Sequence, residues 1–86
     1  MIRLNDGTEI QGEIAMDGNI LWLFLDNISF AEVCGLITDP AKTEKITVVG
    51  DGVETVYFNF THAFYVREEN GRISAGLERS VENVHG

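Results

Sequence analysis

The chain has 86 residues, with 6 Lys and Arg against 14 Asp and Glu, and therefore a formal net charge of −8. This length accommodates one domain with a small core, so we treat residues 1–86 as a single domain. The acidic balance argues against a nucleic acid or an anionic membrane as a partner, because like charges repel. The one cysteine, Cys34, excludes a disulfide within the chain.

Asp-Gly and Asn-Gly pairs separate the apolar runs of the chain. Such pairs favour tight turns between antiparallel strands, because these residues adopt positive φ at little cost. The four pairs begin at Asp6, Asp17, Asp51 and Asn70. The first half of the chain is therefore predicted to hold strands over 2–4, 8–15 and 20–25.

The strand predicted over 20–25 has no polar residue. A period of two places Trp22 and Phe24 on one side and the three leucines on the other. Both sides are apolar, so we expect a central strand that is covered on each face. The run is too short to cross a bilayer.

A single short helix is predicted over about 29–39. Ser29 and Glu32 have the spacing of a capping box, in which each side chain reaches the other residue's backbone N–H. Apolar positions follow at helical spacing and predict a buried stripe. This stripe consists of Phe30, Val33, Cys34 and Ile37. Pro40 ends the helix near Asp39.

The second half of the chain is predicted to be β structure again, with strands over 45–49, 53–60, 63–67 and 72–78. In the second of these, Val56, Phe58 and Phe60 are expected to share a face, and a break is expected near Thr61 and His62. The polar tail over about 80–86 has no pattern. The fold class is α+β: a mostly antiparallel, twisted sheet or partly open barrel of six or seven strands, with one short helix packed on it.

No catalytic motif occurs in the sequence. There is no Gly-x-Ser-x-Gly elbow, phosphate-binding glycine loop or pair of metal-ligand motifs. Cys34 is predicted to be a small buried hydrophobe, because no basic residue adjoins it. His62 would act as a base only with an acid within hydrogen-bond distance. We therefore predict no enzyme, no catalytic residue, no metal site and no cofactor.

The aromatic residues point to an interaction surface. The chain has eight of them, more than the core of so small a domain is expected to hold. We expect Trp22, Tyr57 and Tyr65 to form a possible interface on a sheet face away from the helix. The partner would be another protein or a second copy of the chain in a homo-oligomer, with no nucleic acid and no membrane. The alternative is a barrel or sandwich that hides both faces.

Residues 28–47 include the sequence Phe-Ala-Glu at the helix and Asp-Pro-Ala-Lys-Thr at the following corner. Together with the opening Leu-Asn-Asp-Gly-Thr at 4–8, this stretch resembles small uncharacterised proteins of prophage tail-gene regions in Gram-positive bacteria. The resemblance covers most of the chain but carries no catalytic residue. It implies a phage or prophage origin for this protein.

These observations predict a non-enzymatic structural or assembly protein of the phage tail region that acts through protein–protein contacts. The alternative is a small-ligand or peptide-binding module that uses a sheet edge or the aromatic face. No basic segment leads into an apolar run at the N-terminus, so no signal peptide is expected. The expected location is the host cytoplasm or the virion.

Overall fold

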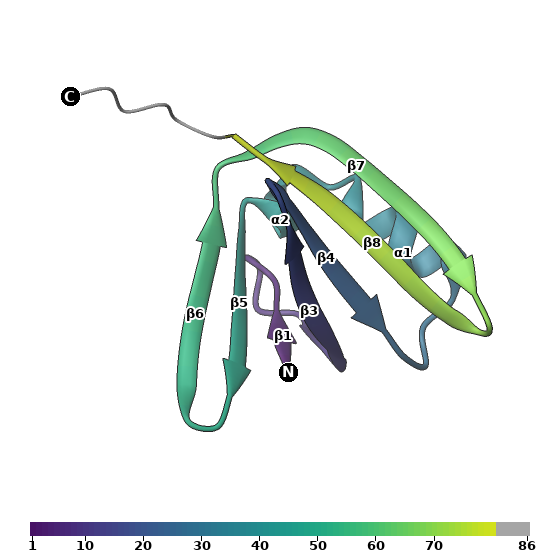
Figure 1. Ribbon diagram of the computed structural model, residues 1–86, viewed down its shortest axis with the longest axis horizontal. Coiled ribbons are helices and arrows are strands. Elements are labelled where there is room, and N and C mark those ends of the chain that lie inside the picture. Colours follow the sequence, from purple (N-terminus) through teal and green to yellow (C-terminus); the bar gives the residue numbers. More distant parts are fainter. Residues whose placement is uncertain (81–86) are drawn as a thin grey trace.

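The computed structural model describes residues 1–80, apart from the side chain of His62 (Figure 1). The elements in chain order are β1 (Ile2–Arg3), β2 (Glu9–Ile10), β3 (Gly12–Asp17), β4 (Ile20–Leu25), α1 (Phe30–Ile37), α2 (Pro40–Thr43), β5 (Lys45–Gly50), β6 (Val53–Phe58), β7 (Phe60–Glu69) and β8 (Arg72–Arg79). The predicted tail over 80–86 lies outside the described residues except for Ser80.

The strands form two antiparallel sheets of four strands each, in the orders β2-β1-β5-β6 and β3-β4-β8-β7. Gln11 joins β2 to β3 and Asn59 joins β6 to β7, so the chain passes directly between the sheets at both places. The predicted α+β class with mostly antiparallel strands is confirmed. Eight strands occur in the described part of the chain where six or seven were predicted, because Gln11 divides the run predicted over 8–15 into β2 and β3. Within residues 1–80 the sheets do not close into a barrel.

Two hairpins have the turn conformation that the sequence predicts. Asp51 and Gly52 have φ of 51° and 77°, and Asn70 and Gly71 have φ of 53° and 76°. Positive φ at both central residues defines a type I′ turn, whose twist matches that of the flanking strands. The registers of β5 with β6 and of β7 with β8 follow from these turns.

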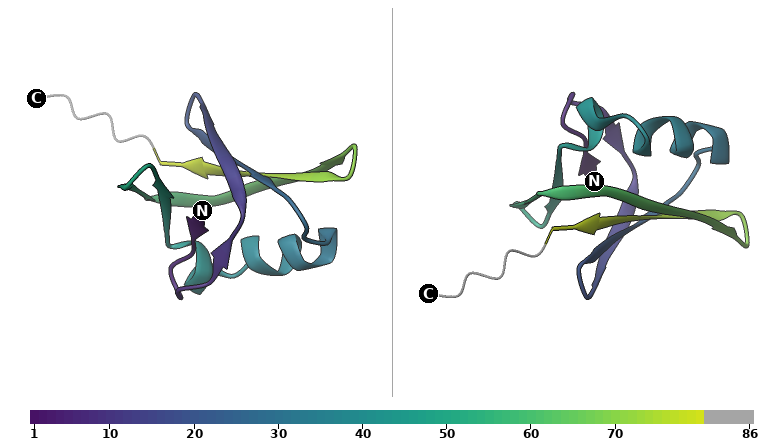
Figure 2. Two further views of the ribbon diagram at one scale, coloured as in Figure 1. Left: turned by 90° about the horizontal axis from the view of Figure 1, so that it is seen from below. Right: turned by 90° about the horizontal axis from the view of Figure 1, so that it is seen from above.

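The core is aliphatic. Its buried side chains are Ile2, Leu4, Leu21, Leu23, Leu25, Val33, Ile37, Ile46, Ile73, Ala75 and Leu77. They come from both sheets and from α1, which lies with α2 on one side of β7 and β8 (Figure 2). All eight aromatic side chains lie outside this fully buried set. The fully buried core within residues 1–80 therefore holds no aromatic side chain, although Tyr57 and Phe60 pack against it.

Helix α1 begins as predicted. The Ser29 hydroxyl accepts a hydrogen bond from the Glu32 backbone N–H at 3.1 Å and donates one to the Glu32 carboxylate at 3.2 Å. The glutamate thus binds the serine side chain rather than its backbone. Asp39 then caps α2, with Pro40 in the first helical turn. The helix predicted over about 29–39 is therefore α1, and α2 is a second short helix that follows the predicted stop at Pro40.

The buried stripe of α1 differs from the prediction at its first residue. Val33 and Ile37 are buried and Leu36 packs against the core, whereas Phe30 is 46% exposed. The buried side of α1 is formed by Val33, Leu36 and Ile37. At 3.6 residues per turn, Phe30 lies beside this stripe and away from the core. Cys34 is half-buried for the same reason.

The strand predicted over 53–60 ends earlier than expected. Asn59 has φ of 67°, so β6 ends at Phe58 and β7 starts at Phe60. Val56 and Phe58 are exposed, whereas Phe60 packs against the core, so the three side chains do not form one buried face. The expected break near residue 61 lies at Asn59, with a register irregularity following in β7.

Candidate interaction surface

The sheet β3-β4-β8-β7 has one side that faces the core and α1 and another that no described element covers (Figure 2). We call the uncovered side the outer face. Strand β4 crosses the middle of this sheet, as predicted. Its leucines are buried on the core side, whereas Trp22 and Phe24 are only half-buried on the outer face. The prediction that both faces of this strand would be covered is therefore wrong within residues 1–80.

Trp22 and Tyr65 lie together on the outer face. Their ring centroids are 6.3 Å apart, and the rings are tilted by 33°. Tyr65 is 48% exposed. The Arg67 guanidinium lies over the Trp22 ring, 5.6 Å from its centroid. This geometry is that of a cation–π contact.

The Trp22 ring lies directly over Gly76 of the neighbouring strand. A Cβ added to Gly76 would stand 2.9 Å from the nearest ring carbon. Only a glycine therefore allows the ring to lie this close to the sheet. The backbone of β8 thus helps to set the orientation of the tryptophan.

Phe24 has an equivalent arginine. The Arg72 guanidinium lies 5.6 Å from the centroid of the Phe24 ring. It also contacts the Glu13 carboxylate at 3.5 Å and, through Nε, the Asp26 carboxylate at 3.2 Å. The Nε contact with Asp26 is an ion pair without an aligned hydrogen bond. These contacts hold the arginine across the aromatic ring.

Tyr57 lies elsewhere. It belongs to β6 in the other sheet, opposite Ile46, and it packs against the edge of the core. The Arg79 guanidinium lies 5.5 Å from its ring centroid and donates a hydrogen bond to the Phe58 carbonyl. Of the three predicted interface residues, the structure brings Trp22 and Tyr65 together and separates Tyr57 from them.

The arginines and Gly76 are part of this surface that the sequence interpretation missed. A two-residue turn at Asn70 and Gly71 places Tyr65 opposite Gly76. This pairing could therefore be predicted from the sequence of the turn. The pairing of Trp22 with Gly76 joins strands from distant parts of the chain. No local pattern in the sequence specifies that pairing.

A groove of about 610 Å³ lies between the helices and the β6–β7 corner. Its apolar lining includes the exposed side chains of Phe58 and Phe64. Thr38, Thr43, Glu44 and Asn59 supply the polar part. The groove is thus an apolar hollow with a few polar groups, which is the usual character of a small-molecule site.

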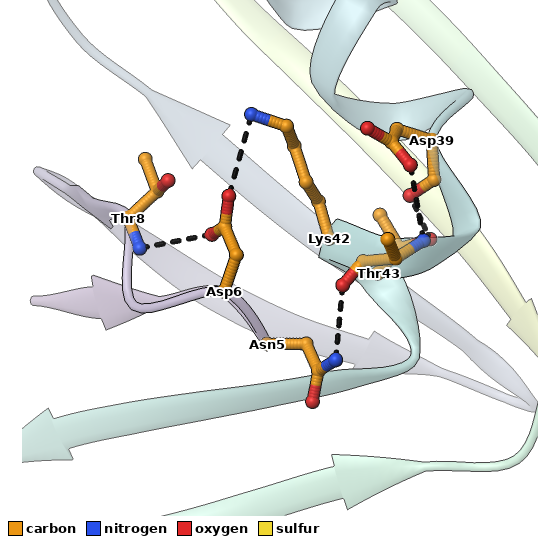
Figure 3. Close-up of polar contacts among 7 residues, drawn as sticks. Asn5, Asp6, Thr8, Asp39, Lys42 and Thr43 are labelled. Carbon is orange, nitrogen blue, oxygen red and sulfur yellow. Dashed lines mark hydrogen bonds and ion pairs between the residues drawn. The ribbon is translucent and has the colours of Figure 1, made fainter.

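A polar cluster joins the first turn to α2 (Figure 3). The Asp6 carboxylate accepts a hydrogen bond from the Thr8 backbone N–H at 3.0 Å and lies 3.4 Å from the Lys42 ammonium. The bond from the Thr8 backbone, with smaller effects of the Thr8 side chain and Lys42, holds the pKa of Asp6 below its ordinary value. Asn5 also donates to the Ala41 carbonyl at 2.9 Å. These contacts fix the turn on the helix.

The described part of the chain contains no group of three or more His, Cys, Asp or Glu side chains that is placed to hold a metal ion. None of the helices in residues 1–80 has the length and apolar character to cross a membrane. The side chain of His62 lies outside the described residues, so its suggested role as a base stays untested.

Comparison with protein-family models, curated proteins and solved structures finds no match for this chain.

Proposed function

We propose that this protein is a non-enzymatic structural or assembly protein that acts through protein–protein contacts made by the outer face. The observation that carries the proposal is the position of Trp22, Phe24 and Tyr65 on a sheet face that no element within residues 1–80 covers. Clustered aromatic side chains on an open surface are typical of interaction sites.

The arrangement of the face supports the same function. Tryptophan, tyrosine and arginine are the residues most enriched among those that dominate binding energies. Here Arg67 lies over the Trp22 ring and Arg72 lies over the Phe24 ring. Gly76 allows the Trp22 ring to lie close to the sheet. Less side-chain entropy is lost on binding when the contacting groups are ordered in advance.

The proposed setting is the tail region of a phage or prophage, either in the host cytoplasm or in the virion. Its support is the resemblance of residues 28–47 and of the opening turn to small proteins of prophage tail-gene regions. In the structure, these two segments contact each other through Asn5, Asp6 and Lys42. They therefore form one structural unit, although they are separate in sequence.

The test is co-assembly with the proteins encoded beside this one. Each neighbouring protein is purified, mixed with the chain and examined by sedimentation velocity. We expect complex formation, and we expect Trp22→Ala to weaken it at least tenfold, in keeping with the loss of a dominant interface residue. Phe30→Ser is the control, because Phe30 is also exposed but lies on α1. Equal binding by wild type and Trp22→Ala would contradict the proposal.

The second candidate is a small-ligand or peptide-binding module, and the groove beside Phe58 and Phe64 favours it. Titration with short apolar peptides, followed by backbone amide NMR shifts, tests this function. Shifts confined to residues of the groove would support it. Shifts confined to the outer face would support the assembly function instead.

A further inference from the structure

We propose that the outer face is self-complementary and that two copies of this chain pair through it, face to face. This inference rests on the proposed function, because it names the partner of the same surface. Its basis is the order of large, small and charged residues across the four strands of the sheet.

The registers arrange the outer face in rows that run across β3, β4, β8 and β7. One row is Glu13, Phe24, Ser74 and Arg67, and the next is Ala15, Trp22, Gly76 and Tyr65. In the first row, an acid and a base lie on opposite edges of the sheet. In the second, the small residues Ala15 and Gly76 alternate with the large rings.

Consider a two-fold axis that lies between the sheets of the two copies, parallel to the strands and midway between β4 and β8. This axis places β3 of each copy over β7 of the other copy, and β4 over β8. Tyr65 then lies over Ala15 of the second copy, and Phe24 lies over its Ser74. The place over Gly76 is already taken by the Trp22 ring of the same chain, so the two Trp22 rings meet each other beside the axis. Two of the three rings in each copy thus meet a small residue, which favours close packing of the two sheets.

The same axis also matches the charges. It places Arg67 over Glu13 of the second copy, and the reverse contact follows from symmetry. Among residues 1–80 the structure shows no ion pair for Arg67, whose guanidinium lies over the Trp22 ring. The Glu13 side chain is 77% exposed, with one contact to Arg72. Both groups are therefore available for contacts between copies.

Charge distinguishes this arrangement from the other face-to-face dimer with a two-fold axis. An axis perpendicular to the strands would superpose the β3 edges of the two copies. Glu13 would then lie near Asp17 of the second copy, and like charges at close range disfavour pairing. The acidic residues of β3 and Arg67 of β7 thus favour the two-fold axis that runs parallel to the strands.

The size of the face sets the expected strength. Four strands at a spacing of about 4.8 Å and about six residues along each strand give a footprint of about 19 by 20 Å. This area is below the roughly 800 Å² per partner of standard stable interfaces. The third row, in which Ile20 lies over Glu78 of the second copy, is also less well matched. We therefore expect a weak dimer with a micromolar Kd.

The test is sedimentation equilibrium of the full chain from roughly 1 µM to 1 mM, a range that brackets a micromolar Kd. Trp22 is the one tryptophan, so its emission provides an independent readout of burial. We expect Arg67→Glu and Glu13→Arg each to weaken the dimer at least tenfold. The double variant re-forms the opposite-charge pair and should restore the wild-type Kd to within about threefold.

Lys45→Glu is the matched control, because it reverses an exposed charge on the other sheet and should leave the Kd unchanged. Ala15→Trp is a second variant without a charge change. It fills the place that Tyr65 of the other copy would occupy and should also abolish pairing. Circular dichroism and an unfolding curve establish that each variant is folded.

A wild-type chain that stays monomeric at the highest concentration would overturn this inference. A dimer that is insensitive to the single reversals, or that the double variant does not restore, would overturn it as well. Neither result would affect the test with neighbouring tail proteins, in which the same face meets a different partner. Conversely, a dimer with charge-swap rescue and no binding to those proteins would support this inference and count against the tail-assembly role.

Discussion

The absence of a side chain at Gly76 determines how close the Trp22 ring lies to the outer face of the sheet. Because Gly76 has no side chain, the indole ring can lie close to the backbone of β8, where it contacts Tyr65 and Arg67. The face is thus formed by a backbone position as much as by its aromatic residues.

Gly76→Ala should therefore disturb the face and the fold together. The new methyl group would stand 2.9–3.0 Å from three ring carbons of Trp22, so the ring must move. We expect a loss of about 1–3 kcal/mol in the free energy of unfolding, as for overpacked sites, and a shift in Trp22 emission. Urea denaturation followed by fluorescence measures both. Gly50→Ala is the control, because a methyl group there meets nothing within 4 Å.

Asp6 provides a prediction about pH. Its pKa in the folded protein is lowered from the ordinary value of 3.8, chiefly by the Thr8 backbone N–H and secondarily by the Thr8 side chain and Lys42. A lowered pKa in the folded state means that the ionised carboxylate contributes stability above pH 3.8, and that this contribution disappears as the pH falls through the folded-state value. Replacement by asparagine removes this contribution.

The stability difference between wild type and Asp6→Asn should therefore be largest near neutral pH and should shrink below pH 3.8. Urea midpoints of both proteins across this range provide the measurement. Asp17→Asn is the control, because Asp17 is another turn carboxylate and has no ion pair within residues 1–80. A difference that grew on acidification would contradict the assignment.

Among the elements, α1 is the one whose limits the sequence predicts best, because both ends have local signals. Ser29 and Glu32 define its start, and Pro40 defines a stop shortly after it. Its buried side is less predictable: Phe30 and Cys34 fit a helical stripe equally well in sequence. The sheet on which the helix docks selects Leu36 instead.

Two substitutions in α1 should have opposite effects. Ser29→Ala removes the cap of the Glu32 N–H and should destabilise the protein by about 1 kcal/mol. Gly35→Ala should stabilise it by about 0.5–1 kcal/mol, because alanine favours the helix and its methyl group would meet nothing within 4 Å. Thermal unfolding monitored by circular dichroism compares both with wild type. If both substitutions shifted the thermal midpoint equally and in the same direction, helix propensity would not determine how much α1 contributes to stability.

The β5–β6 and β7–β8 hairpins were predictable for the same reason as the helix, since a two-residue turn fixes the register of its own strands. The β3–β4 turn has Gly18 and Asn19 at its centre, one residue later than the predicted Asp17-Gly18 pair. The candidate surface was predictable only in part. The turns place Trp22 opposite Ala15 and Tyr65 opposite Gly76. Bringing these two pairs side by side requires β4 to pair with β8, which depends on packing of the aliphatic core rather than on any local signal.

At the scale of the whole molecule, the excess of acid opposes folding. The net charge of −8 is spread over 86 residues, and the ion pairs are at the surface, where each contributes little. Screening should therefore relieve more repulsion than attraction. The molecule is expected to be more stable at moderate than at low ionic strength.

Raising the concentration of NaCl should thus raise the thermal midpoint, as measured by calorimetry of the monomer at low protein concentration. Glu68→Lys lowers the net negative charge and should reduce this dependence on salt. Glu68 is exposed and lies on β7. A midpoint that fell with salt would mean that the surface ion pairs, and not the net charge, dominate the electrostatics.

The pairing of β4 with β8 has a consequence for the synthesis of the chain on the ribosome. Strand β4 is the most apolar segment, and its partner on one side is the last strand described. While the chain is still growing, that edge and the tryptophan beside it have no neighbour. The nascent protein therefore exposes its most adhesive strand until β8 has left the ribosome, which makes it a natural client for chaperones that bind short hydrophobic segments.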